Sequence, residues 1–191
     1  MAVTSANRYL TRAEMEGNAK AIAFVFLANG WSLNAIAAML GNMESESGIN
    51  PGIYEGLDDT SSTNGFGLVQ WTPNTKYKDW CDDNGYSPYY DDIFYQIERI
   101  IYEVDNGLQW ISTSAYPLSF KDFRTSNATP EYLAQAFLYN YERPKSLNQP
   151  NRSTQARAWY NFILNLYPVT PTPTKKHELS KLLLYYAGTR R

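Results

Sequence analysis

The stretch SLNAIAAMLGNMESESGINP, residues 32–51, decides how this chain is organised. Ser32 is a favoured residue for capping the start of a helix. The apolar residues that follow it recur at helical spacing and form one stripe: Leu33, Ile36, Ala37 and Leu40. Gly48, followed shortly by a proline, is typical of a helix end. The stretch therefore predicts a helix between Ser32 and Gly48, with Glu44 and Glu46 in its last turn.

These two acids are candidates for acid–base chemistry. A carboxyl in the last turn of a helix faces the negative end of the helix dipole, which favours the protonated form that a general acid needs. Helical periodicity places Glu44 near the apolar stripe and Glu46 beside Met39 at its margin, a slight preference for Glu44. Acids near a helix end are also ordinary solvated surface, so the pattern by itself leaves both interpretations open.

The segments around this helix are mostly helical as well. Thr11 and Glu14 form a capping-box pattern, and a Thr-Pro pair at 129–130 is a common helix start. The segments expected to be helical are 11–30, 91–106, one that begins at 129 and one that contains 156–166. Only GFGLVQWT, residues 65–72, reads as a strand, because turn residues flank it. The expected fold is α+β and mainly α, with a small β-hairpin or sheet beside the helix that carries the acids.

Composition excludes several functional classes. With 43% hydrophobic residues, 19% charged residues and a net charge of −2, the 191 residues suit a globular domain that has no general affinity for nucleic acid, so no nucleic acid binding is expected. No apolar run approaches the roughly 20 residues that span a bilayer, and the start lacks the apolar core of a signal peptide. The single cysteine, Cys81, and the single histidine, His177, cannot form a common zinc site, so neither a metal nor a cofactor is expected.

Three motifs in order carry a resemblance to a known family: GNMESES (41–47), GFGLVQWT and YNYERP (139–144). Together they resemble the tail-associated lysozyme domain of bacteriophages, especially the tail-tip proteins of small podovirus-type phages of Gram-positive bacteria. More distantly, the chain resembles goose-type lysozymes and soluble lytic transglycosylases. The resemblance covers about residues 8–167. It implies a lysozyme-like fold, a place at the tail tip or knob of the virion, and cleavage of the β-1,4 bond between N-acetylmuramic acid and N-acetylglucosamine in host peptidoglycan.

The resemblance also implies roles for single residues. The second acid of GNMESES matches the catalytic glutamate, which makes Glu46 the general acid and overrules the slight preference for Glu44. Tyr141 resembles a tyrosine that faces this glutamate across the cleft. The sequence also holds 16 tyrosines, whose rings suit a groove for sugars. The residues expected to bind the glycan are Ser47, Tyr54, Gln70, Trp71 and Tyr141.

A second carboxylate usually stabilises the positive charge that develops in glycoside hydrolysis. Asp58 and Asp59 precede GFGLVQWT, where lysozyme-like folds tend to place this group, and Asp58 is the candidate. Without it, Glu46 could act as acid and then as base while the 6-hydroxyl of the muramoyl unit attacks, so a hydrolase and a lytic transglycosylase both stay open. Glu142 and Arg143 are expected to form a structural ion pair.

Two functions of other classes compete with this interpretation. A pair of Cys81 and His177 could serve a cysteine peptidase, but neither residue lies in a recognisable local motif, and a proline-rich stretch separates His177 from the domain. A sugar-binding or structural tail protein could also retain the fold without catalysis, because fold alone does not determine function. Loss of wall cleavage on substitution of Glu46 distinguishes the enzyme from this second alternative.

The domain boundary is expected near residue 168, where PVTPTPTKK begins. Its alternating prolines favour an extended linker. Residues 1–167 are expected to form the lysozyme-like domain, and 168–191 a Pro/Thr linker with a basic amphipathic segment that docks on another tail protein. Related tail-tip proteins often carry a zinc peptidase domain after the lysozyme. No such domain is recognised in this sequence, so cleavage of peptide cross-links is not expected.

Overall fold

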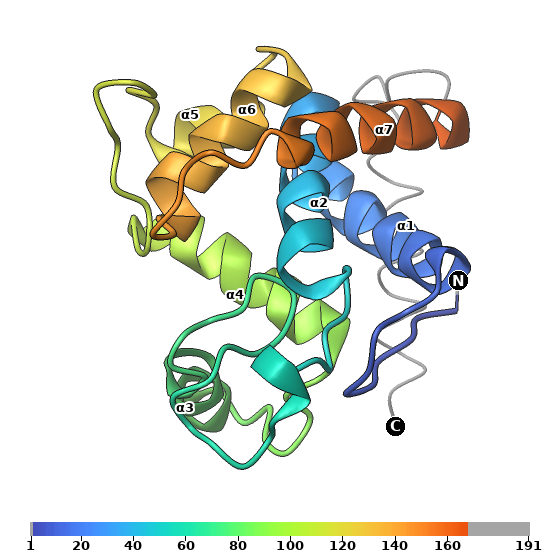
Figure 1. The fold of residues 1–191 in the computed structure, drawn as a ribbon, viewed down its shortest axis with the longest axis vertical. Coiled ribbons are helices and arrows are strands. Elements are labelled where there is room, and N and C mark those ends of the chain that lie inside the picture. The colour runs from blue at the N-terminus through green and yellow to red at the C-terminus, as the bar shows by residue number, and fades with distance from the viewer. Residues whose placement is uncertain (1, 168–191) are drawn as a thin grey trace.

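The computed structural model describes residues 2–167, and the predictions for the linker and the basic segment lie outside this range. The described part is mainly helical (Figure 1). Its elements are α1 (Arg12–Ala28), α2 (Leu33–Ser47), a 3-10 turn η1 (Glu55–Leu57), α3 (Thr75–Asp83), α4 (Ile93–Asn106), α5 (Phe120–Thr125), α6 (Pro130–Phe137), a π-helical turn η2 (Leu138–Glu142) and α7 (Asn151–Leu166). Among the helices of the described part, none combines the length and the apolar character that crossing a membrane requires.

The predicted helix starts and ends agree with the structure where local signals set them. The Thr11 side chain and Glu14 form the capping box of α1, and Ser32 caps α2 by accepting a hydrogen bond from a backbone N–H. Gly48 ends α2 in the left-handed conformation. Thr129 caps α6. Such a cap is worth about 1 kcal/mol, which is enough to define where a helix begins.

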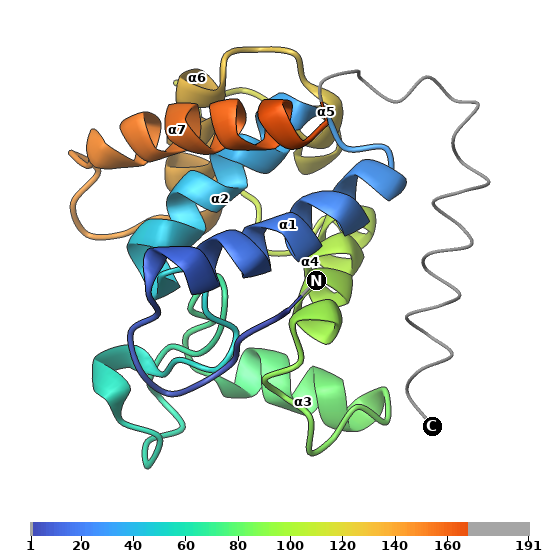
Figure 2. The same cartoon turned by 90° about the vertical axis from the view of Figure 1, so that its right-hand side faces the viewer.

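Helix α2 lies in the middle of the molecule, with α6 and α7 at one end and α3 at the opposite end (Figures 1 and 2). It packs mainly against α7 and α6. Gly41 permits the close approach of α7, because a Cβ at this position would lie 2.6 Å from the backbone N of Ala156 and 2.7 Å from the carbonyl O of Arg152. The fold therefore brings the start of α7 beside the second half of α2.

The expected strand at 65–72 is wrong. Within the described residues, this stretch forms only isolated bridges, between Phe66 and Tyr54 and between Phe66 and Trp71. A turn over 67–70 separates the bridged residues. The backbone N–H of Leu68 donates to the side-chain Oε1 of Gln96 at 2.8 Å, and its carbonyl accepts from the Ser47 hydroxyl at 2.9 Å. Side chains of two helices thus take the hydrogen bonds that a neighbouring strand would have made.

The structure also contains elements that the sequence pattern did not reveal. Helix α3 buries only Tyr77 and Cys81, and α5 has six residues and buries two phenylalanines. Both helices are too short or too polar to display a long apolar stripe. The π-helical turn η2 continues α6 directly and carries most of the YNYERP motif. Single π-helical turns occur frequently at functional sites.

Candidate functional site

A cavity of about 450 Å³ lies at the carboxyl end of α2, and its lining includes Glu46. The rest of the lining comes from the N-terminal segment, from the loop that contains η1, from 69–72, from Lys76 of α3, from Gln109 and from the YNYERP motif. Of the sequence-predicted site residues, the cavity brings together Glu46, Tyr54, Gln70, Trp71 and Tyr141. Ser47 and Asp58 are not part of its lining.

Glu46 is held by an ion pair from the start of α7. Its side chain is 21% exposed, and its Oε1 contacts the Nη2 of Arg152, which is 4% exposed. The guanidinium is fixed by two further contacts: Nη1 donates to Oδ1 of Asn42 at 2.9 Å, and Nε donates to Oε1 of Gln149 at 2.7 Å. The orientation of the Glu46 carboxyl is therefore set by a buried, multiply anchored cation.

Glu44 occupies a different environment. Its Oε2 accepts a hydrogen bond from Nε1 of Trp159 at 2.7 Å, and its Oε1 pairs with Arg12 at 3.3 Å. It does not line the cavity. The two acids of the last turn thus face different neighbours, and Glu46 is the one that borders open space.

The buried carboxyl of Glu103 holds two residues of the cavity lining, Tyr141 and Trp71, in place. Glu103 of α4 accepts from the Tyr141 hydroxyl at 2.6 Å, from Nε1 of Trp71 at 2.9 Å and from Nε of Arg99 at 2.9 Å. Burial raises the pKa of Glu103. The Tyr141 hydroxyl therefore points to Glu103 within the core, and the expected orientation toward Glu46 is not observed for this group.

Trp71 lines the cavity but is itself almost completely buried. Its ring is 3% exposed and stacks on Tyr77, with 4.7 Å between ring centroids. Because this stacking and burial occupy its ring, the geometry gives no support to the expected contact between Trp71 and the glycan.

Gln70 and Tyr54 form the wall on the loop side. Gln70 has a positive φ of 49°, and its Nε2 donates to the carbonyl oxygens of Ile53 at 3.2 Å and Gly67 at 3.0 Å. The Tyr54 hydroxyl accepts from Nζ of Lys78 at 2.9 Å. Both side chains line the cavity and are held by contacts within the protein.

Ser47 and Asp58 lie elsewhere. Ser47 is buried, and its hydroxyl lies 3.0 Å from the Met43 carbonyl and 2.9 Å from the Leu68 carbonyl, so it joins α2 to the 65–72 turn. Asp58 is exposed, and its carboxylate accepts from the hydroxyl and backbone N–H of Thr60 and from Asn64. The Thr60 hydroxyl bond is the largest cause of the lowered pKa of Asp58. Asp58 thus stabilises its own loop outside the cavity lining.

The expected ion pair between Glu142 and Arg143 is not formed. Nη1 of Arg143 instead donates to the backbone carbonyls of Gln109 and Asn140. Glu142 lines the cavity, and its Oε1 is buried without a hydrogen-bond partner. Burial, and then the negative charge of Glu46, raise the pKa of Glu142 well above the usual carboxyl range. Glu142 is therefore a second carboxyl of the cavity, and one that favours its protonated form.

Two candidate functional residues, Arg152 and Tyr9, were not predicted from the sequence. Arg152 lies 106 residues after Glu46 and gives no local signal, because an arginine near a helix start is ordinary. Tyr9 lines the cavity from the N-terminal segment, and only its aromatic character could have suggested a ligand contact. Across residues 2–167, no cluster of three or more histidine, cysteine or acidic side chains suited to holding a metal ion is found.

Comparisons with known proteins show which family the chain belongs to. Residues 17–163 match the family described as phage tail lysozyme. The chain is also 49% identical over 159 residues, or 83% of its length, to morphogenesis protein 1 of Bacillus phage B103. The matched part is 42% of that relative, so the chain spans less than half of the relative's length. The family match includes α2 with its two acids, the 65–72 turn and the YNYERP motif. The chain belongs to the phage tail lysozyme family.

Proposed function

We propose that this chain is a peptidoglycan-cleaving lysozyme with a lysozyme-like fold and that Glu46 is its general acid. The observation that carries the proposal is the placement of Glu46: it lies in the last turn of α2, borders the cavity and is oriented by Arg152. The substrate is the glycan strand of the host wall, cut between N-acetylmuramic acid and N-acetylglucosamine. The chain acts as a tail protein of the virion, at the tail tip or knob, during entry into the host. Other tail proteins are its proposed partners.

In the proposed reaction, Glu46 transfers its proton to the glycosidic oxygen while the bond between that oxygen and C1 breaks. Arg152 contacts Oε1, which leaves Oε2 as the oxygen that donates the proton. The departing sugar keeps the bonding electrons, and positive charge develops at C1 of the remaining sugar. The oxygen of the attacking water or hydroxyl group then bonds to C1 while Glu46, now a carboxylate, takes the proton from that oxygen, and the carboxyl is restored.

The attacking group decides between two products. A water gives a reducing end, as in a hydrolase, and the 6-hydroxyl of the muramoyl unit gives an anhydro end, as in a lytic transglycosylase. Asp58 lies outside the cavity lining, and Glu142 favours its protonated form, so neither readily supplies a negative charge there. This favours a reaction that depends on one glutamate, and it keeps the transglycosylase as a second candidate. The catalytic role of Asp58 stays a prediction that Asp58→Asn tests.

Mass spectrometry of the fragments released from purified Gram-positive walls tests the proposal. Fragments with a reducing N-acetylmuramic acid identify a muramidase, and anhydro-muramoyl ends identify a transglycosylase. Release of neither fragment by a folded protein contradicts the proposed activity and supports a glycan-binding or structural role.

A further inference from the structure

Tyr9 is an exposed aromatic side chain that borders the cavity. It is 75% exposed, yet it contributes to the same lining as Glu46 and Gln70. An exposed tyrosine alone is ordinary, because much of any protein surface is apolar. Here, however, the ring belongs to a segment that the rest of the protein holds in place.

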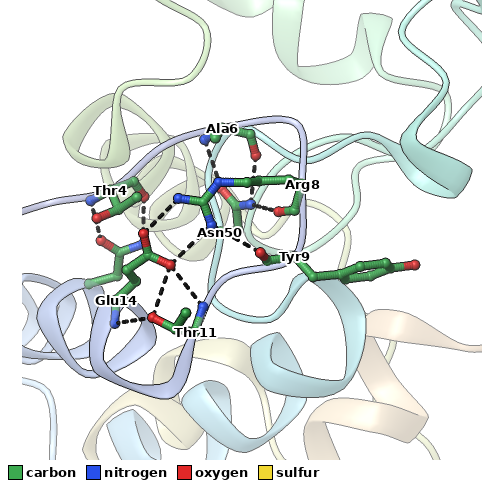
Figure 3. A network of polar contacts seen from close by, with 8 residues as sticks. Thr4, Ala6, Arg8, Tyr9, Thr11, Glu14 and Asn50 are labelled. Atoms are coloured by element: carbon green, nitrogen blue, oxygen red, sulfur yellow. Dashed lines mark hydrogen bonds and ion pairs between the residues drawn. The ribbon is translucent and has the colours of Figure 1, made fainter.

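The backbone around Tyr9 is anchored by a buried side chain. Asn50, which is fully buried just after α2, donates to the carbonyl oxygens of Ala6 and Arg8 at 2.7 Å each. Its Oδ1 also accepts from the backbone N–H of Ala6 at 3.3 Å. The Arg8 guanidinium donates to the Tyr9 carbonyl at 3.0 Å. Figure 3 shows these contacts, with the Tyr9 ring projecting away from them.

Two further sets of contacts, made by Arg8 and Asn7, anchor the segment. Arg8 forms a two-pronged ion pair with Glu14, with distances of 3.0 Å and 2.6 Å, and so ties the segment to the first turn of α1 (Figure 3). Asn7 donates to the Leu57 carbonyl at 3.0 Å and accepts from the Tyr54 N–H at 3.1 Å, and so ties it to the loop of the cavity wall.

The same loop approaches the segment closely at another point. A Cβ at Gly52 would lie 2.7 Å from the backbone N of Ala6, so only glycine lets the two backbones pass at this distance. The position of Tyr9 is thus fixed relative to α1, to the end of α2 and to the loop that carries Tyr54.

A ring held in this way costs little to order when a ligand binds, because the backbone has already lost its freedom during folding. A tyrosine offers an apolar face together with a polar edge, which suits the alternating C–H and hydroxyl groups of a sugar ring. In contrast, Trp71 and Tyr141 have their polar groups engaged by Glu103 within the core. Tyr9 is therefore the most exposed of the aromatic residues that line this cavity.

We propose that Tyr9 is a stacking platform for one N-acetylhexosamine ring of the glycan, at the rim of the cavity, and that the segment 4–11 exists in this conformation to present it. This inference rests on the proposed peptidoglycan function. It adds a binding residue that acts on substrate affinity and leaves the proton transfer at Glu46 unchanged.

Binding of a tetrasaccharide of alternating N-acetylglucosamine and N-acetylmuramic acid to the full chain, measured by calorimetry in a Glu46→Gln background, tests the platform. Tyr9→Ala should weaken binding about threefold to tenfold, the range expected for one aromatic contact, and Tyr9→Trp should retain it. The matched control is Tyr89→Ala, because Tyr89 is 64% exposed and lies outside the cavity lining. This control should bind as tightly as the parent.

In the active background, Tyr9→Ala should raise KM with little change in kcat, whereas Tyr9→Trp and Tyr89→Ala should keep the parent KM. All three variants should melt within a few degrees of the parent. Equal tetrasaccharide affinity of Tyr9→Ala and the parent, or no binding by the parent, overturns the platform. Binding that depends on Tyr9 in a protein that releases no wall fragments supports the platform and contradicts the proposed catalysis. If Tyr9→Ala cleaves walls with an unchanged KM and binds the tetrasaccharide with unchanged affinity, the result supports the catalysis and contradicts the platform.

Discussion

Glu142 is a residue whose protonation changes on folding. Burial raises its pKa above the ordinary value of 4.5, and the negative charges of Glu46 and Glu103 act in the same direction, while Arg152 and Arg143 oppose them. Above pH 4.5 the unfolded chain loses this proton and the folded protein keeps it. Stability therefore falls as pH rises from that value through the folded pKa.

Glu142→Gln should remove this pH-dependent loss of stability, because a glutamine amide does not ionise in this pH range. We expect the melting temperature of the variant to decline less between pH 4.5 and pH 8 than that of the wild type, and the variant to be the more stable protein at pH 8. Asp59→Asn, which changes an exposed acid far from Glu142 in the sequence, should leave the decline of the melting temperature with pH as in the wild type. If the melting temperature of Glu142→Gln declined with pH as steeply as that of the wild type, Glu142 would be shown to titrate as an ordinary surface acid.

We expect Arg152 to act on the proposed chemistry through Glu46. Arg152→Lys keeps the positive charge but cannot hold Gln149, Asn42 and Glu46 together, because lysine lacks the planar fork of donors. We expect kcat to fall about tenfold to a hundredfold with KM little changed, which is the cost of a misplaced catalytic group. The control is Arg157→Lys on the same helix, whose pair with Glu131 lies at the surface. An unchanged kcat in Arg152→Lys would mean that the pair is structural only.

At the scale of elements, the contact between α2 and α7 positions the site. Gly41→Ala would ordinarily favour a helix by up to about 1 kcal/mol. Here the added methyl meets the backbone of α7 at Ala156 and Arg152, so we expect a net loss of about 1–3 kcal/mol in the free energy of unfolding. Denaturant titration measures this loss, and kcat should fall with it because Arg152 moves away from Glu46. A stabilised variant would contradict this account of the interface.

The same scale explains which elements could be predicted. Helices α1, α2 and α6 begin at Thr11, Ser32 and Thr129, whose capping contacts lie within a few residues and are readable in the sequence. The 65–72 turn could not be predicted, because its backbone partners are Gln96 and Ser47 on distant segments. For the site, periodicity slightly favoured Glu44, and only the motif resemblance selected Glu46. Tertiary packing brings Arg152 to Glu46 and Tyr9 to the cavity, and local sequence patterns do not encode this packing.

At the scale of the whole molecule, the cavity lies where the carboxyl end of α2 meets the loop of η1 and the turn after α6. Residues far apart in the sequence therefore converge there: an N-terminal ring, an acid at the end of a helix, a glutamine from a turn and a carboxyl from YNYERP. The central claim is that this convergence serves one proton transfer from Glu46. Glu44, two residues earlier, provides the matched comparison, because it is similarly exposed but faces Trp159 and Arg12.

The most direct test compares Glu46→Gln with Glu44→Gln in the rate at which purified Gram-positive walls lose turbidity, at a temperature where both variants are shown to be folded. We expect the rate of Glu46→Gln to be about 10²–10⁴-fold lower than that of the wild type, the usual cost of a missing general acid. Glu44→Gln should keep most of the rate, with at most a lower melting temperature. Equal rates in the two variants, or a loss confined to Glu44→Gln, would contradict the assignment of Glu46.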